Sequence, residues 1–158
     1  MIFVTLGNVP IPFIRLAKKV DEIAEKMNED IVIQHGHTEY PFKNVRKHKF
    51  LSSNEMERLI TDASFIISHG GYGTISECLM RNKKVIAVPR ILGEHNHSQE
   101  ELVRALEAGG YIIGVYNTED LEGKIRDIDT FVPKLLKKGN AGKVINEFMH
   151  TSLIVGKQ

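Results

Sequence analysis

Short apolar runs alternate with segments of helical periodicity along most of this chain, and few folds accommodate that order. Runs that read as strands occupy residues 2–6, where the strand is expected to be buried, and residues 30–36, 47–51, 64–68, 85–89 and 111–115, of which 47–51 is short. Strands that alternate with helices form βαβ units with right-handed crossovers and a mostly parallel sheet. The sequence therefore predicts a single α/β, Rossmann-like domain over residues 1–158.

The intervening segments carry helix signals. Apolar residues recur at three- and four-residue spacing from Phe13 to Met27, after Pro10 and Pro12, which suit the start of a helix. Ser52 with Glu55, and Ser98 with Glu101, have the spacing of a capping box. We expect helices after each of these points, and another with Ile75, Cys78 and Leu79 on its inner face.

In a parallel sheet, ligands bind beyond the carboxyl ends of the strands. That edge is expected to carry Gly7 and Asn8 and the segments 35–37, 68–74 and 90–99. The unusual motifs of the sequence are thus predicted to meet at one rim.

The stretch "SHGGYGTISE" (68–77) puts three glycines where a strand turns into a helix. A helix N-terminus offers unpaired N–H groups and about half a positive charge, and glycines let a phosphate come close to them. Gly70, Gly71 and Gly73, with the Thr74 hydroxyl, are predicted to cradle a diphosphate.

Two other interpretations of this turn remain open. Thr74 and Glu77 have capping-box spacing, so they could simply cap the helix. The run from Gly71 to Ser76 also approaches the dinucleotide fingerprint G-x-G-x-x-G, with Glu94 where a ribose-binding acid belongs. Ser76 replaces the third glycine, however, and the motif lies mid-sheet rather than at the first strand.

Metal chemistry is a further alternative. His35 with His37, and His95 with His97, are H-x-H pairs that could ligate a divalent ion together with His69 or Glu94. No C-x-x-C or H-E-x-x-H accompanies them, so we favour polar rim residues. The pair Asp127 and Asp129 is read as a solvated helix or turn, and Cys78 as a small core residue.

Composition limits the partners. The formal net charge is +1, which predicts no nucleic-acid partner, although the basic runs 46–49, 81–84 and 134–138 could face anionic lipid. With one cysteine, no intrachain disulfide can form. The sequence shows no signal peptide and no apolar run of about 18 residues. We expect a cytoplasmic protein.

The runs "SHGGYGTISECL", "VIAVPR" and "GEHNHSQ" together resemble the C-terminal, donor-binding domain of family 28 glycosyltransferases. They are similar above all to its stand-alone donor subunits, such as that of the two-component UDP-GlcNAc transferase of lipid-linked oligosaccharide synthesis and those of capsule and exopolysaccharide synthesis. The likeness covers residues 1 to about 115, and it implies the C-terminal half of a GT-B enzyme. Asn8 stands where many relatives have threonine, and "EHNHSQ" is shorter than their E-H-x-x-x-H-Q loop.

The resemblance also implies roles for individual residues. Gly70 to Thr74 would hold the donor diphosphate, with Gly7 and Asn8 facing the diphosphate or the sugar. Glu77 matches the acid that holds the ribose hydroxyls, and Glu94, His95 and Gln99 match the loop that contacts the donor sugar or phosphates. His69 is the candidate base in this chain. Such enzymes generally use neither a cofactor nor a bound metal.

Sugar transfer needs a donor surface and an acceptor surface, and this chain is expected to supply the first. The resemblance implies a membrane-associated partner subunit that holds a lipid-linked or polysaccharide acceptor, and an inverting transfer from UDP-GlcNAc, or else from UDP-Gal or UDP-Glc. The apolar segment 144–155, within 140–158, either packs on its own core or docks on that partner; in the second case the isolated chain is inactive or forms a homo-oligomer. A non-catalytic enhancer subunit is the other hypothesis.

Overall fold

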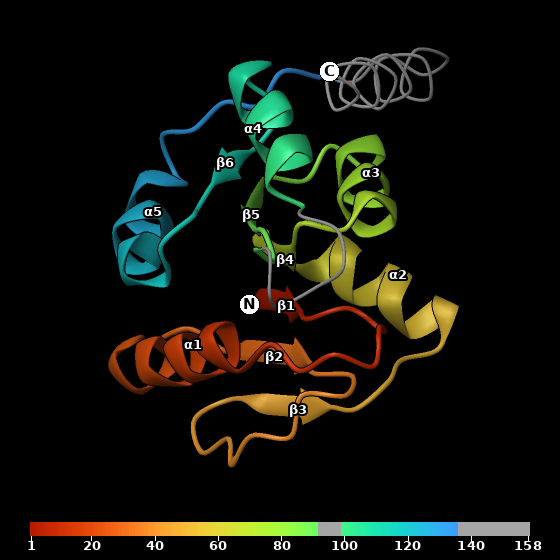
Figure 1. The fold of residues 1–158 in the computed structure, drawn as a ribbon, viewed down its shortest axis with the longest axis vertical. Helices are drawn as coiled ribbons and strands as arrows, with labels where there is room; N and C mark the ends of the chain where they lie inside the picture. Colours follow the sequence, from red (N-terminus) through yellow and green to blue (C-terminus); the bar gives the residue numbers. More distant parts are fainter. Residues whose placement is uncertain (92–98, 136–158) are drawn as a thin grey trace.

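A parallel sheet runs through the middle of the computed structural model, which describes residues 1–91 and 99–135 (Figure 1). Its strands are β1 (Ile2–Thr5), β2 (Ile31–Gln34), β3 (Arg46–His48), β4 (Phe65–His69), β5 (Val85–Val88) and β6 (Ile113–Gly114). They lie in the order β3-β2-β1-β4-β5-β6, and every neighbouring pair is parallel. The predicted α/β architecture is confirmed.

Helices cover both faces of the sheet (Figure 1). On one face lie α1 (Ile14–Lys26) and α5 (Leu121–Asp127), the latter preceded by the 3-10 turn η1 (Thr118–Asp120). On the other lie α2 (Ser53–Asp62), α3 (Tyr72–Met80) and α4 (Glu100–Ala108). A sheet covered on both sides needs strands that are apolar throughout, which is why these strands read as continuous apolar runs.

Strand β1 shows how the two cores are built. Ile2 and Val4 pack in the cluster under α1, whereas Phe3 packs in the cluster under α2, α3 and α4. All three are fully buried. Complete burial of one such side chain stabilises the fold by about 1.5–3 kcal/mol, so β1 anchors both helix layers.

Some element boundaries differ from those predicted. The third strand is shorter than residues 47–51 and begins one residue earlier, and its three side chains are exposed. Periodicity is a weak guide there, because the strand buries nothing. The capping box of Ser52 and Glu55 is present at α2, but α4 begins at Glu100 with Gln99 as its N-cap. Ser98 lies outside the described residues.

The side of the sheet to which successive strands are added changes at β1. β1 pairs with β2 on one side and with β4 on the other, so successive crossovers lead away from it in opposite directions. The loops after β1 and β4 therefore diverge and leave a crevice beyond the carboxyl ends of these two strands.

Asp21 ties α1 to the loop that precedes β3. Its buried carboxylate Oδ1 accepts hydrogen bonds from the backbone N–H groups of Lys43 (3.0 Å) and Asn44 (2.9 Å). The Asn44 side chain donates to the Asp21 carbonyl oxygen as well, at 3.2 Å. This contact places the segment that leads through β3 into α2.

We predict that Asp21→Ala lowers the free energy of unfolding by about 2–3 kcal/mol, because it leaves two amide donors without their charged acceptor. Urea unfolding followed by circular dichroism would measure the loss. Glu25→Ala, on the exposed face of the same helix, is the matched control and should change stability by less than about 0.5 kcal/mol. Equal effects of the two substitutions would contradict the assignment.

Candidate functional site

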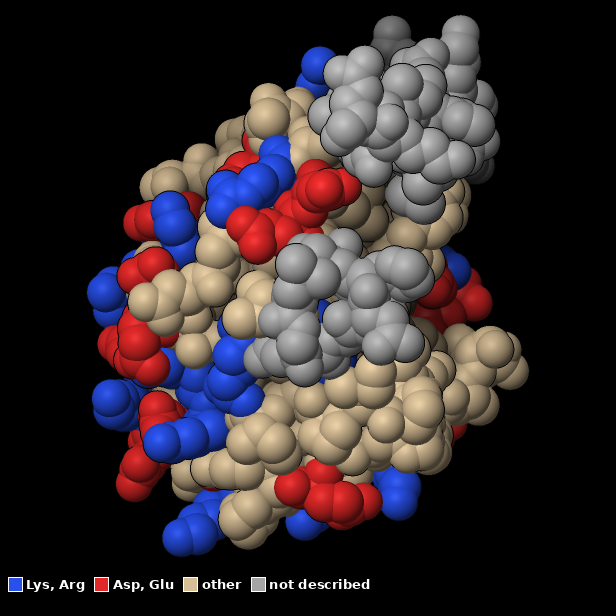
Figure 2. Space-filling view, in the orientation of Figure 1, with Lys and Arg blue, Asp and Glu red and all other residues tan. Residues whose placement is uncertain are grey.

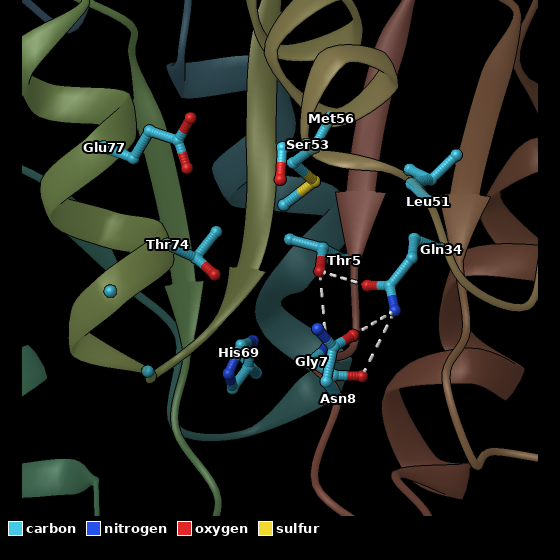
Figure 3. Close-up of a pocket in the computed structure, with 12 residues that line it drawn as sticks. Thr5, Gly7, Asn8, Gln34, Leu51, Ser53, Met56, His69, Thr74 and Glu77 are labelled. Carbon is cyan, nitrogen blue, oxygen red and sulfur yellow. Dashed lines mark hydrogen bonds between the residues drawn. The ribbon is translucent and has the colours of Figure 1, made fainter.

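A cleft of about 610 Å³ opens between the loops after β1 and β4, at the point where the strand order reverses (Figure 3). It is lined by Thr5, Gly7, Asn8, Gln34, Leu51, Ser53, Met56, His69, Gly71, Gly73, Thr74 and Glu77. Seven of these were predicted site residues from two separate segments: Gly7, Asn8, His69, Gly71, Gly73, Thr74 and Glu77. The sequence thus identified the rim and much of the cleft.

The N-terminus of α3 faces this cleft. Gly71 is its N-cap, and the N–H groups of the first turn have no acceptor within the helix. A Cβ added at Gly73 would meet no atom within 4 Å, so this turn is open to a ligand. Because α3 begins at Tyr72, Thr74 lies inside the first turn; the interpretation of Thr74 and Glu77 as a capping box is wrong.

The His69 imidazole lies between two glycines of the site. A Cβ at Gly71 would come within 2.2 Å of His69 Nε2, and one at Gly7 within 2.7 Å of the same atom. Gly7 also has φ +81°, a conformation that side chains rarely adopt. Both loops therefore come close to the same imidazole nitrogen, and His69 is 9% exposed there.

Gln34 organises the opposite wall from the end of β2. It accepts a hydrogen bond from Thr5 Oγ1 (2.6 Å) and donates one to Asn8 Oδ1 (2.7 Å) (Figure 3). Sequence reasoning missed both Thr5 and Gln34. The available signal was the polar residue that closes each of two otherwise apolar strands.

Glu77 and an apolar wall face the cleft from different helices. Glu77 projects from α3, while Leu51 and Met56 come from the start of α2 and the loop before it (Figure 3). The Glu77 side chain is 36% exposed, and its Oε1 lies 3.5 Å from Arg81 Nη2. The cleft thus combines helix-terminal N–H groups, a carboxylate and a small apolar surface.

Gly70 and Gln99 lie behind the cleft rather than among its lining residues. A Cβ at Gly70 would come within 2.7 Å of Gln99 Cβ and 3.0 Å of Pro89 Cα, so this glycine permits close packing. Gln99 Oε1 accepts the backbone N–H of Arg90 at 3.1 Å. Both residues therefore contribute to the packing of the turn after β4 rather than to the lining of the cleft.

Arg90 is a buried cation, 1% exposed, that holds the loop after β1 at both ends. Its guanidinium donates to the carbonyl oxygens of Leu6 and Pro12, each at 3.0 Å, and stacks over Phe13 with 4.4 Å to the ring centroid. The loop that carries Gly7 and Asn8 is therefore held by hydrogen bonds from the Arg90 guanidinium at its first and last residues.

The remaining predicted residues divide into two groups. Glu94, His95 and His97 lie outside the described residues. His35 is buried with Nδ1 3.0 Å from the Thr38 carbonyl oxygen, and His37 packs edge-on against Phe50. Within residues 1–91 and 99–135, no three His, Cys, Asp or Glu side chains are grouped so that they could hold a metal ion.

On the face shown in Figure 2, acidic and basic side chains intermingle. Lys19 pairs with Glu119, and Arg126 with Glu122. No helix in the described part of the chain is long and apolar enough to span a membrane.

Comparison with protein families matches residues 1–151 to the glycosyltransferase family 28 C-terminal domain. The chain belongs to this family. A relative from Prochlorococcus marinus (strain MIT 9215), a UDP-N-acetylglucosamine–N-acetylmuramyl-(pentapeptide) pyrophosphoryl-undecaprenol N-acetylglucosamine transferase, is 27% identical over 115 residues, which are 73% of this chain and 31% of the relative. The family 28 domain described here thus spans about a third of the length of this relative.

Solved structures share its fold. The solution structure of ALG13 matches with a TM-score of 0.63 at 15% identity, covering 94% of this chain and 96% of that one. The Streptomyces sp. SF2575 glycosyltransferase SsfS6, solved with thymidine diphosphate, matches with a TM-score of 0.57 at 20% identity, covering 94% of this chain and 37% of that one. The family 28 domain therefore has the fold of glycosyltransferase domains.

We predict that Cys78 of the family 28 domain does not react with thiol reagents in the folded protein. Burial on the inner face of α3 raises the pKa of its thiol to about 12, so only about one thiol in 10,000 is ionised at pH 8. Titration with a chromogenic disulfide should find no thiol before denaturant is added and one afterwards. Rapid labelling of the native protein would show that α3 opens.

We predict that alanine lowers the stability of the protein at Gly71 but not at Gly73. Gly71→Ala forces the buried His69 ring to move, and such overpacking costs about 1–3 kcal/mol. Gly73→Ala adds a methyl group in open space within a helix, which should leave stability equal or raise it by up to about 1 kcal/mol. Thermal unfolding of the two variants checks this, and a destabilised Gly73→Ala would contradict it.

Proposed function

We propose that this chain binds a UDP-sugar in the cleft and acts as the donor half of an inverting glycosyltransferase. UDP-GlcNAc is the proposed donor, ahead of UDP-Gal and UDP-Glc, because the Prochlorococcus relative is a UDP-N-acetylglucosamine-dependent transferase. The transfer would deliver the sugar to a lipid-linked or polysaccharide acceptor.

The open N-terminus of α3 is the observation that carries this proposal. Its N–H groups and partial positive charge face the cleft where the strand order reverses, and Gly73 leaves the space for a phosphate. Gly71 continues the same surface. A diphosphate in this position needs no metal ion to offset its charge, because the helix dipole and backbone N–H groups do so.

The rest of the cleft suits a nucleoside. Leu51 and Met56 offer an apolar surface on which a planar base can lie, and the Glu77 carboxylate can accept hydrogen bonds from two ribose hydroxyls. The base and ribose would then lie toward α2 and the body of α3, with the diphosphate at the helix N-terminus. This order places the sugar at the outer end of the cleft.

In the proposed reaction the acceptor hydroxyl oxygen attacks the anomeric carbon of the sugar. The bond between that carbon and the β-phosphate oxygen breaks, and UDP leaves with the electron pair. The α3 N-terminus stabilises the negative charge that grows on the leaving diphosphate. His69 is the proposed proton acceptor among the described residues, and Glu94 and His95 remain proposed contributors from outside them.

We propose that the acceptor is presented by a second, membrane-associated polypeptide. The described cleft accounts for one substrate, and transfer requires that both be held together. The family 28 domain matches about a third of the Prochlorococcus transferase but 96% of the ALG13 chain, so a chain of this extent has a structural counterpart.

Calorimetric titration with UDP, UDP-GlcNAc, UDP-Gal and UDP-Glc, with and without EDTA, tests the donor site. We expect binding that EDTA does not change and that Glu77→Ala weakens about tenfold, as loss of a carboxylate bound to hydroxyls should. The preferred sugar nucleotide would identify the donor.

Arg81→Ala is the matched control, because it removes the same ion pair and leaves the carboxylate in place. It should bind UDP within about twofold of the wild type, since such an exposed pair contributes little. Binding of NAD in preference to UDP, or no UDP binding by the wild type, would overturn the donor assignment.

A further inference from the structure

The side-chain amide of Gln34 has one orientation that its neighbours permit. Its Oε1 accepts from Thr5 Oγ1 at 2.6 Å. Its Nε2 lies 3.4 Å from each of two backbone carbonyl oxygens, those of Gly7 and Lys49, and 2.7 Å from Asn8 Oδ1. Carbonyl oxygens only accept hydrogen bonds, so the atom that faces them must be the amide nitrogen.

Burial of Thr5 and Gln34 stabilises this arrangement of hydrogen bonds. Gln34 is 2% exposed and Thr5 is 1% exposed, so the hydrogen bond between these two side chains is shielded from water. The Gly7 N–H also points to Thr5 Oγ1, at 3.3 Å. Thr5, Gln34 and the loop after β1 form one hydrogen-bonded unit that spans two adjacent strands.

This unit determines the polarity of Asn8. Because Gln34 donates to Asn8 Oδ1, the acceptor side of the Asn8 amide is occupied from within the protein. The Asn8 nitrogen, which carries two N–H groups, makes no hydrogen bond to the described residues. Asn8 is exposed and lines the cleft, so it offers a ligand donors rather than an acceptor.

Asn8 lies on the same cleft as the N-terminus of α3. Its neighbour Gly7 and Gly71, the N-cap of α3, both come close to His69 Nε2, since a Cβ at either glycine would lie within 2.7 Å of that atom. Asn8 therefore lines the same cleft as Gly71 and Gly73, whose turn carries the backbone N–H groups proposed to hold the diphosphate.

We propose that Gln34 is a positioning residue that orients Asn8 as a hydrogen-bond donor to the terminal phosphate of the bound nucleotide. This inference rests on the proposed function. Gln34 itself need not touch the ligand: it sets which end of the Asn8 amide does. The terminal phosphate is the group that becomes more negative when the sugar leaves, so a fixed donor there supports departure of the diphosphate.

Asn8→Asp is the sharpest test, because it keeps an oxygen for Gln34 and replaces the donor nitrogen with a charged acceptor. We expect UDP to bind at least about tenfold more weakly, since a charge-assisted hydrogen bond is replaced by repulsion. UMP, which lacks the terminal phosphate, should bind within about twofold of its wild-type affinity. Calorimetry of both nucleotides gives the ratio.

A double-mutant cycle tests whether Gln34 acts on UDP binding through Asn8. Gln34→Met removes the donor at similar volume and should lower UDP affinity in the wild type, yet have no further effect in the Asn8→Ala background. If Gln34→Met does not fold, Thr5→Val takes its place, because it removes the hydroxyl that fixes Gln34 Oε1. Effects that add in full would assign Gln34 a purely structural role.

The outcomes separate the two proposals. A wild type that binds neither UDP nor UMP overturns the proposed function, and this inference with it. A wild type that binds UDP, with an unchanged ratio of UDP to UMP affinity in Asn8→Asp, overturns the inference alone. A lowered ratio together with a non-additive cycle supports both.

Discussion

The parallel pairing of β1 with both of its neighbours is the constraint on which the molecule depends. It makes β1 a central strand whose two faces are buried under the two helix layers, and it sends the two halves of the chain away from each other at one edge of the sheet. The crevice is therefore a consequence of strand order rather than of any particular loop. The side chains that give it chemical character come from five elements, β1, β2, β4, α2 and α3, whose carboxyl or amino ends lie at that edge.

The site also depends on the close approach of two backbone loops to one side chain. The loops after β1 and β4 meet around His69 because Gly7 and Gly71 carry no Cβ, while Arg90 and Gln34 fix the first of these loops from two sides. A rigid cleft of this kind loses little conformational entropy when a ligand binds. The same rigidity is needed to keep the Asn8 amide in one orientation, with its oxygen toward Gln34. In a loop that moved freely, the amide oxygen and nitrogen would exchange places.

Residue patterns were sufficient for the features that depend on local sequence. Apolar runs located the buried strands, and the glycine turn with its following helix located the open N-terminus of α3. They did not distinguish the glycines: Gly70, Gly71 and Gly73 look alike in sequence, yet the first packs on Gln99, the second on His69 and the third on nothing. They also missed Gln34, whose contact with Thr5 joins residues 29 positions apart and depends on the pairing of β1 with β2. Such contacts are set by register and crossover, which no short window of sequence contains.

The exposed strand β3 has a consequence for how this molecule can associate. Arg46, Lys47 and His48 occupy one margin of the sheet, and the opposite margin is the two-residue strand β6. A charged margin and a very short one both resist the addition of a further strand from another molecule. Assembly by extending the sheet is thereby discouraged at both of its margins.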